Sequence, residues 1–479
     1  MGLAVGLAAL GYGLWRTNAA RPTAAPGSTP GAAAVSTPGA ATRPGEGADT
    51  RPPAAPDSTP GAATRAGEGA DGRPPNLLVV TLCSVRVDHV GAYGYTPSPT
   101  PRLDALADQS IVFERAWTAA TFTLPSHATL LTGLLPAHVG VLGAEDTLAA
   151  THPTLPDILR RYGYHTFAYA PVASRASFRA GEGLERGFDT FLEGHAGDPA
   201  TALAALGEPY FAVAHFKDAH PPYTRVPGGP KPDPRLVTWA ASRGPDGTRD
   251  ADATFVAALD ADAGLRANLA GRYDHALAAT DAAVGALLDG LAARGLLDDT
   301  VVVVVGDHGT ALGEEGHLGH QGLLQPEVLH VPLLVRLPGG EGAGRRVVDD
   351  VGIVDLAPTL LALAGATPPA RLDGRSLLPL LRGEALPARG VLAQGRLAGQ
   401  ASTAAPHEVL VRGPDWVRHD GAGGYTLRRE VGGVWRDVAE APDPALVAEA
   451  ARLSGDRTVG ATRAPTEAER EALRADGYW

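Results

Sequence analysis

The chain has 479 residues, including 60 glycines, 41 prolines and a single cysteine. That cysteine, Cys83, excludes an internal disulfide and a zinc site built from cysteines alone. The 41 basic and 53 acidic residues give a net charge of −12, which argues against a general nucleic-acid binder and against a basic protein of the membrane surface. The length allows two or three domains, or one large α/β domain with an appendage.

Residues 1–16 predict a short hydrophobic anchor or the remnant of a signal sequence. Residues 2–15 carry no charge, but about 20 apolar residues are needed to span a bilayer. A mis-assigned start codon that clips a longer hydrophobic segment is the alternative explanation. Both explanations predict export, so we expect an extracytoplasmic protein, periplasmic or at the cell surface, tethered to the membrane through its N-terminus.

Residues 17–75 predict a disordered linker. Val35 is the only large aliphatic or aromatic residue in this stretch, so the segment cannot bury enough apolar surface to offset the entropy of ordering. The sequence STPGAATRPGEGADTRPP begins at Ser36 and returns, nearly unchanged, at Ser58, a period of 22 residues. The repeat has no hydrophobic face, so we interpret it as a duplicated linker and not as a solenoid.

Residues 76–395 predict an α/β domain with a large, mostly parallel sheet flanked by helices. Buried strands are expected at 77–82, 164–170, 210–216, 301–305 and 330–337, and helices at 101–110, 125–132, 154–162 and 272–297. After about residue 395, short strands at 409–412, 416–418, 425–429 and 434–437 predict a small antiparallel sheet in a subdomain spanning 396–479. Residues 442–472 are predicted to be helical.

Polar residues follow three of the apolar runs, where ligands bind in parallel sheets. These residues are Cys83, Ser84, Arg86, Asp88 and His89 after the first run, Lys217, Asp218 and His220 after the second, and Asp307 and His308 after the third. Each alone is explained by a turn or a helix cap, but three clusters that end three core strands indicate a site. Asp307 and His308 offer either two metal ligands or an acid oriented for proton transfer.

Thr123 is a candidate nucleophile. Pro125 and Gly133 delimit a short helix, and Thr123 would lie at its N-terminal end, where free amides favour an anion. The alternative is that Thr123 is only the N-cap of this helix.

These clusters resemble, in order and spacing, the sulfatase family of the alkaline-phosphatase superfamily. The matching segments are 76–95, Pro101 to Asp104, Thr123 to Gly133, Lys217 to Tyr223, Asp307 to Gly309, the strand at His330, and two later motifs that begin at Asp355 and Asp373. The resemblance covers about residues 76–390. It implies the sulfatase fold and hydrolysis of sulfate or phosphate esters of small molecules or glycans.

The resemblance also implies site roles. It places Thr123 at the formylglycine position, His127 at that of the signature Arg, and Asp307 and His308 at metal positions. It assigns His220 to contact with the sulfate and His320 to a place beside the leaving group.

The chain departs from the family pattern at four places. Cys83 replaces a metal-binding Asp, His127 replaces the Arg, Gln325 and Pro326 replace a Tyr-Glu pair, and Thr123 cannot be converted to formylglycine. Other superfamily members use a metal-bound Thr as nucleophile. The hypothesis is one divalent metal, zinc or calcium, held by Cys83, Thr123, Asp307 and His308, with zinc favoured if the thiolate is a ligand.

Two other interpretations remain open at this point. The protein is alternatively a non-catalytic binding or scaffold module that has lost a metal ligand. A second metal site formed by His215, Asp218 and His220 is a weaker alternative to an anion contact by His220.

Overall fold

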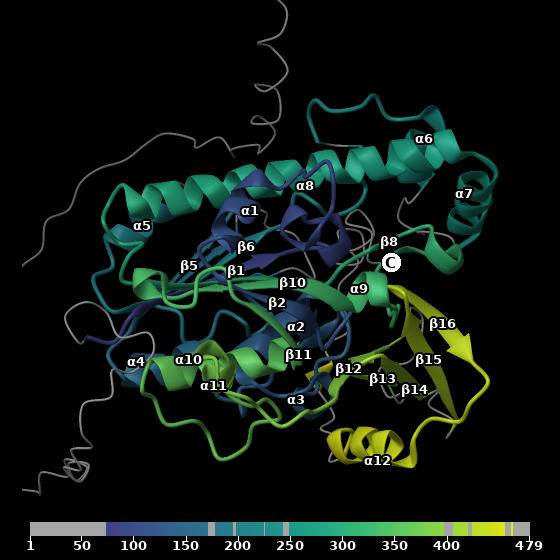
Figure 1. Ribbon diagram of the computed structural model, residues 1–479. Coiled ribbons are helices and arrows are strands. Elements are labelled where there is room, and N and C mark those ends of the chain that lie inside the picture. The colour runs from purple at the N-terminus through teal and green to yellow at the C-terminus, as the bar shows by residue number, and fades with distance from the viewer. Residues whose placement is uncertain are drawn as a thin grey trace, which may run out of the picture. The chain divides into compact units, whose positions relative to one another are not determined.

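The computed structural model describes residues 73–170, 178–194, 198–224, 226–242, 249–396, 406–419, 424–455 and 461–462 (Figure 1). All of them belong to one compact unit, Ala63–Trp479. The predicted N-terminal anchor at 1–16 and nearly all of the predicted linker at 17–75 lie outside the described residues.

An eight-stranded sheet forms the centre of this unit, in the order β11-β2-β10-β7-β1-β6-β4-β5. The strands β7, β1, β6, β4 and β5 are parallel to one another, whereas β10 is antiparallel to both of its neighbours. The predicted mostly parallel sheet is thus confirmed. The strand bounds are β1 Asn76–Leu82, β2 Ile111–Trp117, β4 His165–Ala170, β5 Thr190–Glu193, β6 Tyr210–Phe216, β7 Thr300–Gly306, β10 His330–Arg336 and β11 Arg346–Gly352.

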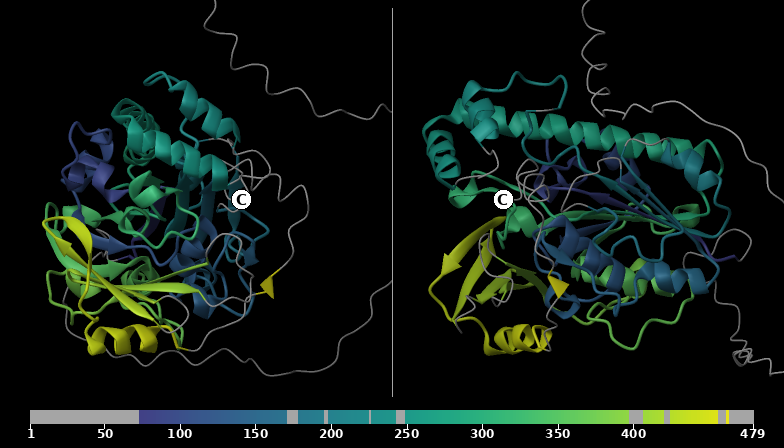
Figure 2. Two further views of the ribbon diagram at one scale, coloured as in Figure 1. Left: turned by 90° about the vertical axis from the view of Figure 1, so that its right-hand side faces the viewer. Right: turned by 180° about the vertical axis from the view of Figure 1, so that it is seen from behind.

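Both faces of this sheet are covered, which is why its central strands are continuously apolar. On β1, Leu77 and Val79 belong to one hydrophobic cluster, while Leu78 and Val80 belong to another on the opposite face. Helix α8 lies along one face with α1 and α5, and α2, α4 and α10 lie on the other (Figures 1 and 2). Parallel strands between two helical layers direct their carboxyl ends to one edge of the sheet, where the site is found.

The helices are mostly short, apart from α8. Their bounds are α1 Pro101–Ala107, α2 Thr123–Thr132, α3 Pro136–Val139, α4 Leu155–Arg161, α5 Pro199–Ala204, α6 Pro234–Ser242, α7 Arg249–Ala261, α8 Ala263–Ala292, α9 Pro326–Leu329, α10 Leu356–Leu363, α11 Leu378–Leu381 and α12 Pro444–Leu453. Short 3-10 helices lie at Val87–His89, Gly91–Tyr93, Glu314–Gly316, Pro338–Gly340 and Ile353–Asp355. Among the described residues, none of the helices has both the length and the apolar character required to cross a bilayer.

A second, antiparallel sheet of five strands follows in the order β12 to β16, as predicted. It packs on the main sheet through tryptophans: Trp117 of β2 meets Trp416 edge to face, with 5.8 Å between ring centroids. The strands are β12 Val391–Gly395, β13 His407–Arg412, β14 Asp415–His419, β15 Tyr425–Val431 and β16 Val434–Val438. The sheet therefore begins at Val391, whereas the predicted subdomain boundary lies at 396.

The helix predicted over 442–472 is confirmed in its first part and is wrong at Ala461 and Thr462, while residues 456–460 and 463–472 lie outside the described residues. Helix α12 ends at Leu453, and β17 (Ala461–Thr462) pairs antiparallel with β3 (Asp146–Thr147). Backbone pairing with a distant edge replaces the local helix, which the sequence pattern could not indicate. A further two-stranded pair, β8 (Ala311–Leu312) and β9 (Leu318–Gly319), follows β7.

Candidate active site

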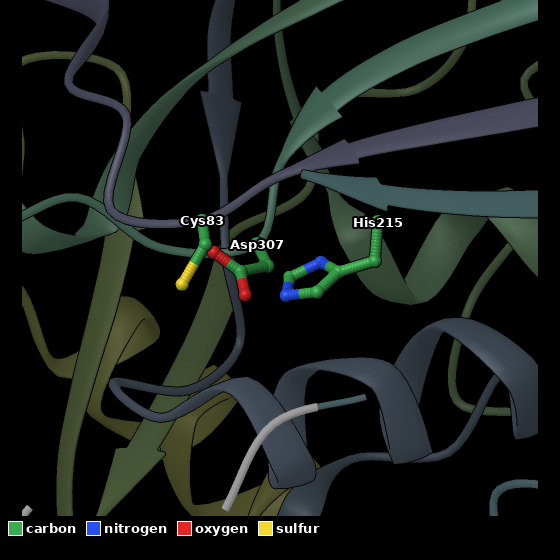
Figure 3. Close-up of side chains that lie close together, drawn as sticks. All are labelled: Cys83, His215 and Asp307. Atoms are coloured by element: carbon green, nitrogen blue, oxygen red, sulfur yellow. The ribbon is translucent and has the colours of Figure 1, made fainter. Parts of the chain in front are cut away.

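The candidate site is formed by residues at the ends of three neighbouring strands, β7, β1 and β6. Cys83 follows β1, His215 lies near the end of β6, and Asp307 follows β7 (Figure 3). The ladder continues past the strand ends, because Cys83 N–H donates to the carbonyl of Phe216 and Asp307 N–H donates to that of Leu82. Cys83, His215 and Asp307 are at most 1% exposed, and one ligand atom from each lies within 4.8 Å of the others. The site is thus built on rigid, buried backbone.

The hydroxyl of Thr123 faces this cluster. Its Oγ1 lies 3.6 Å from Cys83 Sγ and 3.3 Å from His308 Nε2. The N-cap of α2 is Phe122, whose side chain makes no capping hydrogen bond, and Thr123 is the first residue inside the helix. The interpretation of Thr123 as a mere N-cap is therefore wrong, and its hydroxyl points to the proposed metal ligands instead.

Asp307 and His308 are oriented by backbone groups. Asp307 Oδ1 accepts hydrogen bonds from the backbone N–H groups of His308 and Ser84, at 2.7 and 3.3 Å, whereas Oδ2 is buried with no hydrogen-bond partner in the described part of the chain. His308 Nδ1 donates to the carbonyl of Gly309, which leaves the lone pair on Nε2, toward Thr123. Ser84 itself adopts a left-handed φ of 61°, a strained conformation typical of functional sites.

His220 and His320 meet beside these residues. Their Nε2 atoms lie 3.4 Å apart, and each Nδ1 donates to a backbone carbonyl, that of Pro221 or of Thr121. The ring of His320 also packs on that of His308, with centroids 4.1 Å apart. The predicted catalytic residues therefore converge on one place, although the chain brings them from segments far apart in sequence.

His127 lies against the backbone of Thr123, the candidate nucleophile. Its Nδ1 donates to the backbone carbonyl of Thr123, and its Nε2 lies 2.9 Å from the hydroxyl of Thr81. The ring is fully buried and stacks on Phe178. These contacts suit a residue that positions α2 and the side chains behind it.

Burial dominates the electrostatics of the site. It raises the pKa of the Cys83 thiol, and the carboxylate of Asp307 raises it further. Burial also lowers the pKa values of His215 and His220 well below the usual range, and the nearby positive charge of Lys217 lowers both further. Burial thus favours the neutral forms of the Cys83 thiol and of the His215 and His220 imidazoles.

The second metal site considered from the sequence, with His215, Asp218 and His220, is not formed by the described residues. His215 groups instead with Cys83 and Asp307. Sequence reasoning had missed this placement. The only feature of the sequence that could have indicated the role of His215 is that it is a polar residue within an apolar strand. Thr81, which lies opposite His215 in the parallel register, interrupts the apolar run of β1 in the same way.

The other motif residues after β1 stabilise the frame. Buried Arg86 pairs with Asp88 at 2.7 Å and with Glu314 at 2.6 Å, and it also donates to the carbonyl of Thr310. His89 pairs with Asp274 of α8 at 2.7 Å. These pairs fix the loop after β1 to the segment after β7 and to α8.

The comparisons with known proteins agree with this architecture. The sulfatase family model matches residues 75–203 and 198–366. An ulvan-active sulfatase of Formosa agariphila is 26% identical over 345 residues, which cover 61% of this chain and 62% of that protein. Bovine arylsulfatase A is 29% identical over 359 residues, which cover 64% of this chain and 68% of that protein. The matched part is thus about three-fifths to two-thirds of each relative.

A solved structure has the same fold. The phosphonate monoester hydrolase of Agrobacterium radiobacter superposes with a TM-score of 0.59 at 23% identity, over 74% of this chain and 89% of that one. The family match spans more than half of this chain, and the sheet order and the clustered motif residues agree with it. The chain belongs to the sulfatase family.

Proposed function

We propose that this protein hydrolyses sulfate or phosphate-type monoesters by attack of the Thr123 hydroxyl, assisted by a divalent metal. The observation that carries the proposal is the placement of Thr123 Oγ1 at the start of α2, 3.6 Å from Cys83 Sγ and 3.3 Å from His308 Nε2. A threonine hydroxyl is a weak nucleophile unless a metal or base lowers its pKa, and here the candidate ligands surround it.

The residues present fit a metal. Asp307 Oδ2 is buried without a partner, His308 Nε2 presents its lone pair, and the raised pKa of the Cys83 thiol is reversed when a cation binds the thiolate. Sulfur, nitrogen and oxygen donors suit zinc, whereas calcium takes six to eight oxygen ligands. We therefore assign Cys83, Thr123, Asp307 and His308 as the residues that hold a zinc-like ion. When bound, such an ion lowers the pKa of the Thr123 hydroxyl.

The chain's own residues account for the remaining steps. Thr123 Oγ1 forms a bond to the sulfur or phosphorus as the ester bond to the leaving oxygen breaks, and the Thr123 proton passes to solvent. His320, in its imidazolium form, donates its Nε2 proton to the leaving alcohol. Water then attacks the Thr123 ester, releases sulfate or phosphate, and restores the hydroxyl.

Positive groups would hold the anionic substrate. Lys217 is 8% exposed and close enough to influence Cys83, His215 and His220. The N-terminal end of α2 adds the positive end of its helix dipole. His220 is held by the hydrogen bond from its Nδ1 to the carbonyl of Pro221, and it would contact the ester oxygens through Nε2 once the anionic substrate draws a proton onto that nitrogen.

The substrate class follows from the relatives together with the site. One relative is an ulvan-active sulfatase, another an arylsulfatase, and a structural neighbour is a phosphonate monoester hydrolase. We infer a sulfate or phosphonate monoester, on a glycan or on a small molecule. The predicted extracytoplasmic location would suit a glycan substrate.

The test is turnover of an aryl sulfate, a phosphate monoester, a phosphodiester and a phosphonate monoester, with zinc, calcium or manganese supplied. Thr123→Ala should lose activity by about 1,000-fold or more. Thr129→Ala is the matched control, because it removes another buried hydroxyl of α2 that has no partner in the described residues. Equal activity of wild type and Thr123→Ala contradicts the proposal, and no turnover with any metal favours the non-catalytic alternative.

A further inference from the structure

A buried histidine outside the motif positions, His215, lies beside Cys83 and Asp307. His215 Nε2 is buried with no hydrogen-bond partner in the described residues, and so is Asp307 Oδ2. Figure 3 shows the His215 ring pointing toward Asp307 and Cys83. Two unpartnered buried acceptors that face one another are costly unless something binds between them.

A chain of hydrogen bonds determines which nitrogen of His215 carries its proton. It starts at the carbonyl of Thr123, which can only accept, so His127 Nδ1 carries a hydrogen at this contact. The ring of His127 is fully buried and stacked on Phe178, a setting that favours the neutral form, with its lone pair on Nε2. The Thr81 hydroxyl, 2.9 Å away, therefore donates to His127 Nε2.

The same hydroxyl accepts from His215. Thr81 Oγ1 lies 2.9 Å from His215 Nδ1, and its single hydrogen is already used on His127, so His215 Nδ1 must donate. The lone pair of His215 is thereby placed on Nε2, the nitrogen without a partner. Metal-binding histidines are held in the same manner, with the second ring nitrogen donating to a fixed acceptor.

We infer that His215 is a metal ligand through Nε2, together with Cys83 and Asp307, and that Thr81 and His127 position it. This inference rests on the proposed metal site, to which it adds a ligand from β6. His215 raises the number of protein ligands from four to five, and because zinc–ligand distances are about 2.0–2.3 Å, neighbouring ligand atoms in such a site lie about 3–4 Å apart. The three ligand atoms lie within 4.8 Å of one another, so a small inward movement closes the site.

One chain of hydrogen bonds also couples the position of Thr123 to that of His215. The carbonyl of the nucleophile anchors the chain that orients the ligand. A shift of the first turn of α2 would therefore disturb the nucleophile and the ligand together.

The test uses the full chain and metal affinity, not activity. Zn²⁺ affinity is measured by competition with a chromophoric chelator, and Co²⁺ substitution reports the ligands through its thiolate charge-transfer and d–d bands. His215→Ala should weaken affinity by more than the ~10–100-fold typical of losing an outer partner. It should alter the d–d bands but keep the thiolate band. Thr81→Val, which keeps shape and all ligands, should weaken affinity by about 10–100-fold with little change in the bands.

His152→Ala is the matched control, since His152 Nε2 is also buried without a partner but belongs to no metal-capable group of the described residues. It should bind Zn²⁺ as wild type does. Wild-type affinity and bands in His215→Ala, or no metal binding by the wild-type chain, overturn the inference. Hydrolysis with no dependence of affinity on His215 overturns the inference alone, whereas His215-dependent binding without any turnover overturns only the proposed function.

Discussion

Thr81 and His215 face each other across β1 and β6, with Thr81 Oγ1 2.9 Å from His215 Nδ1. Both are polar residues in strands that are otherwise apolar, and both are buried. The hydrogen bond between them explains why two polar side chains are tolerated in the buried core of the sheet. Through His127, it also connects the backbone of α2 to the edge of the sheet where the metal site is proposed.

The dependence of kcat/KM on the leaving group should reveal the role of His320. His320→Gln removes a proton donor beside His308, so its loss of rate should be large for alkyl esters, about 100-fold or more, and small for 4-nitrophenyl esters, which leave without protonation. The measurement is kcat/KM across a series of leaving groups with increasing alcohol pKa. An equal loss for every ester would contradict a role in protonating the leaving group.

Cys83 should set the choice of metal. Cys83→Asp replaces the thiolate with a carboxylate, which hard cations prefer, so activity should shift from zinc toward calcium or manganese. Metal content and turnover are measured after reconstitution with each ion. Cys83→Ser is the control, since it is nearly isosteric but gives neither an anionic oxygen nor a thiolate. Unchanged zinc preference in Cys83→Asp would show that Cys83 is not a ligand.

His138 should make stability depend on pH. Its Nδ1 lies 2.7 Å from Asp373 Oδ2 and its Nε2 3.1 Å from the carbonyl of Gly455, and the Asp373 carboxylate raises its pKa. A raised folded-state pKa means that the ion pair stabilises the fold fully below the unfolded pKa of about 6.5, and that this stability is lost as pH rises through the folded pKa.

His138→Gln should therefore lower the free energy of unfolding by about 1–2 kcal/mol more at acidic than at alkaline pH. Urea unfolding at about pH 5.5 and about pH 8.5 measures the difference. Asp373→Asn supplies the other arm of a double-mutant cycle. An equal cost at both pH values would mean that the pair is not charged in the folded protein.

Much of the fold follows from the sequence because the central strands are buried on both faces. β1, β6 and β7 are fully buried apolar runs, and each was predicted to within a residue. β2 was missed because Glu114 and Arg115 interrupt its apolar run, and Arg115 is accommodated by ion pairs with Asp350 and Glu430. No local pattern reveals partners that lie more than 200 residues away.

The residues of the candidate site also fall into two groups, those that the sequence could indicate and those that it could not. The motif residues Thr123, Asp307 and His308 could be predicted, because they follow strands or begin a helix in a known order. The direction of the Thr123 hydroxyl and the place of His215 could not, since both depend on strand pairing and on hydrogen bonds between distant segments.

The central claim is tested most directly by mass spectrometry of the protein quenched during turnover of an ester substrate. The account predicts that the peptide containing Thr123 carries the mass of one added sulfuryl or phosphoryl group, and that Thr123→Ala carries none. Turnover with the group found on another residue, or with no labelled peptide and undiminished activity in Thr123→Ala, would contradict it.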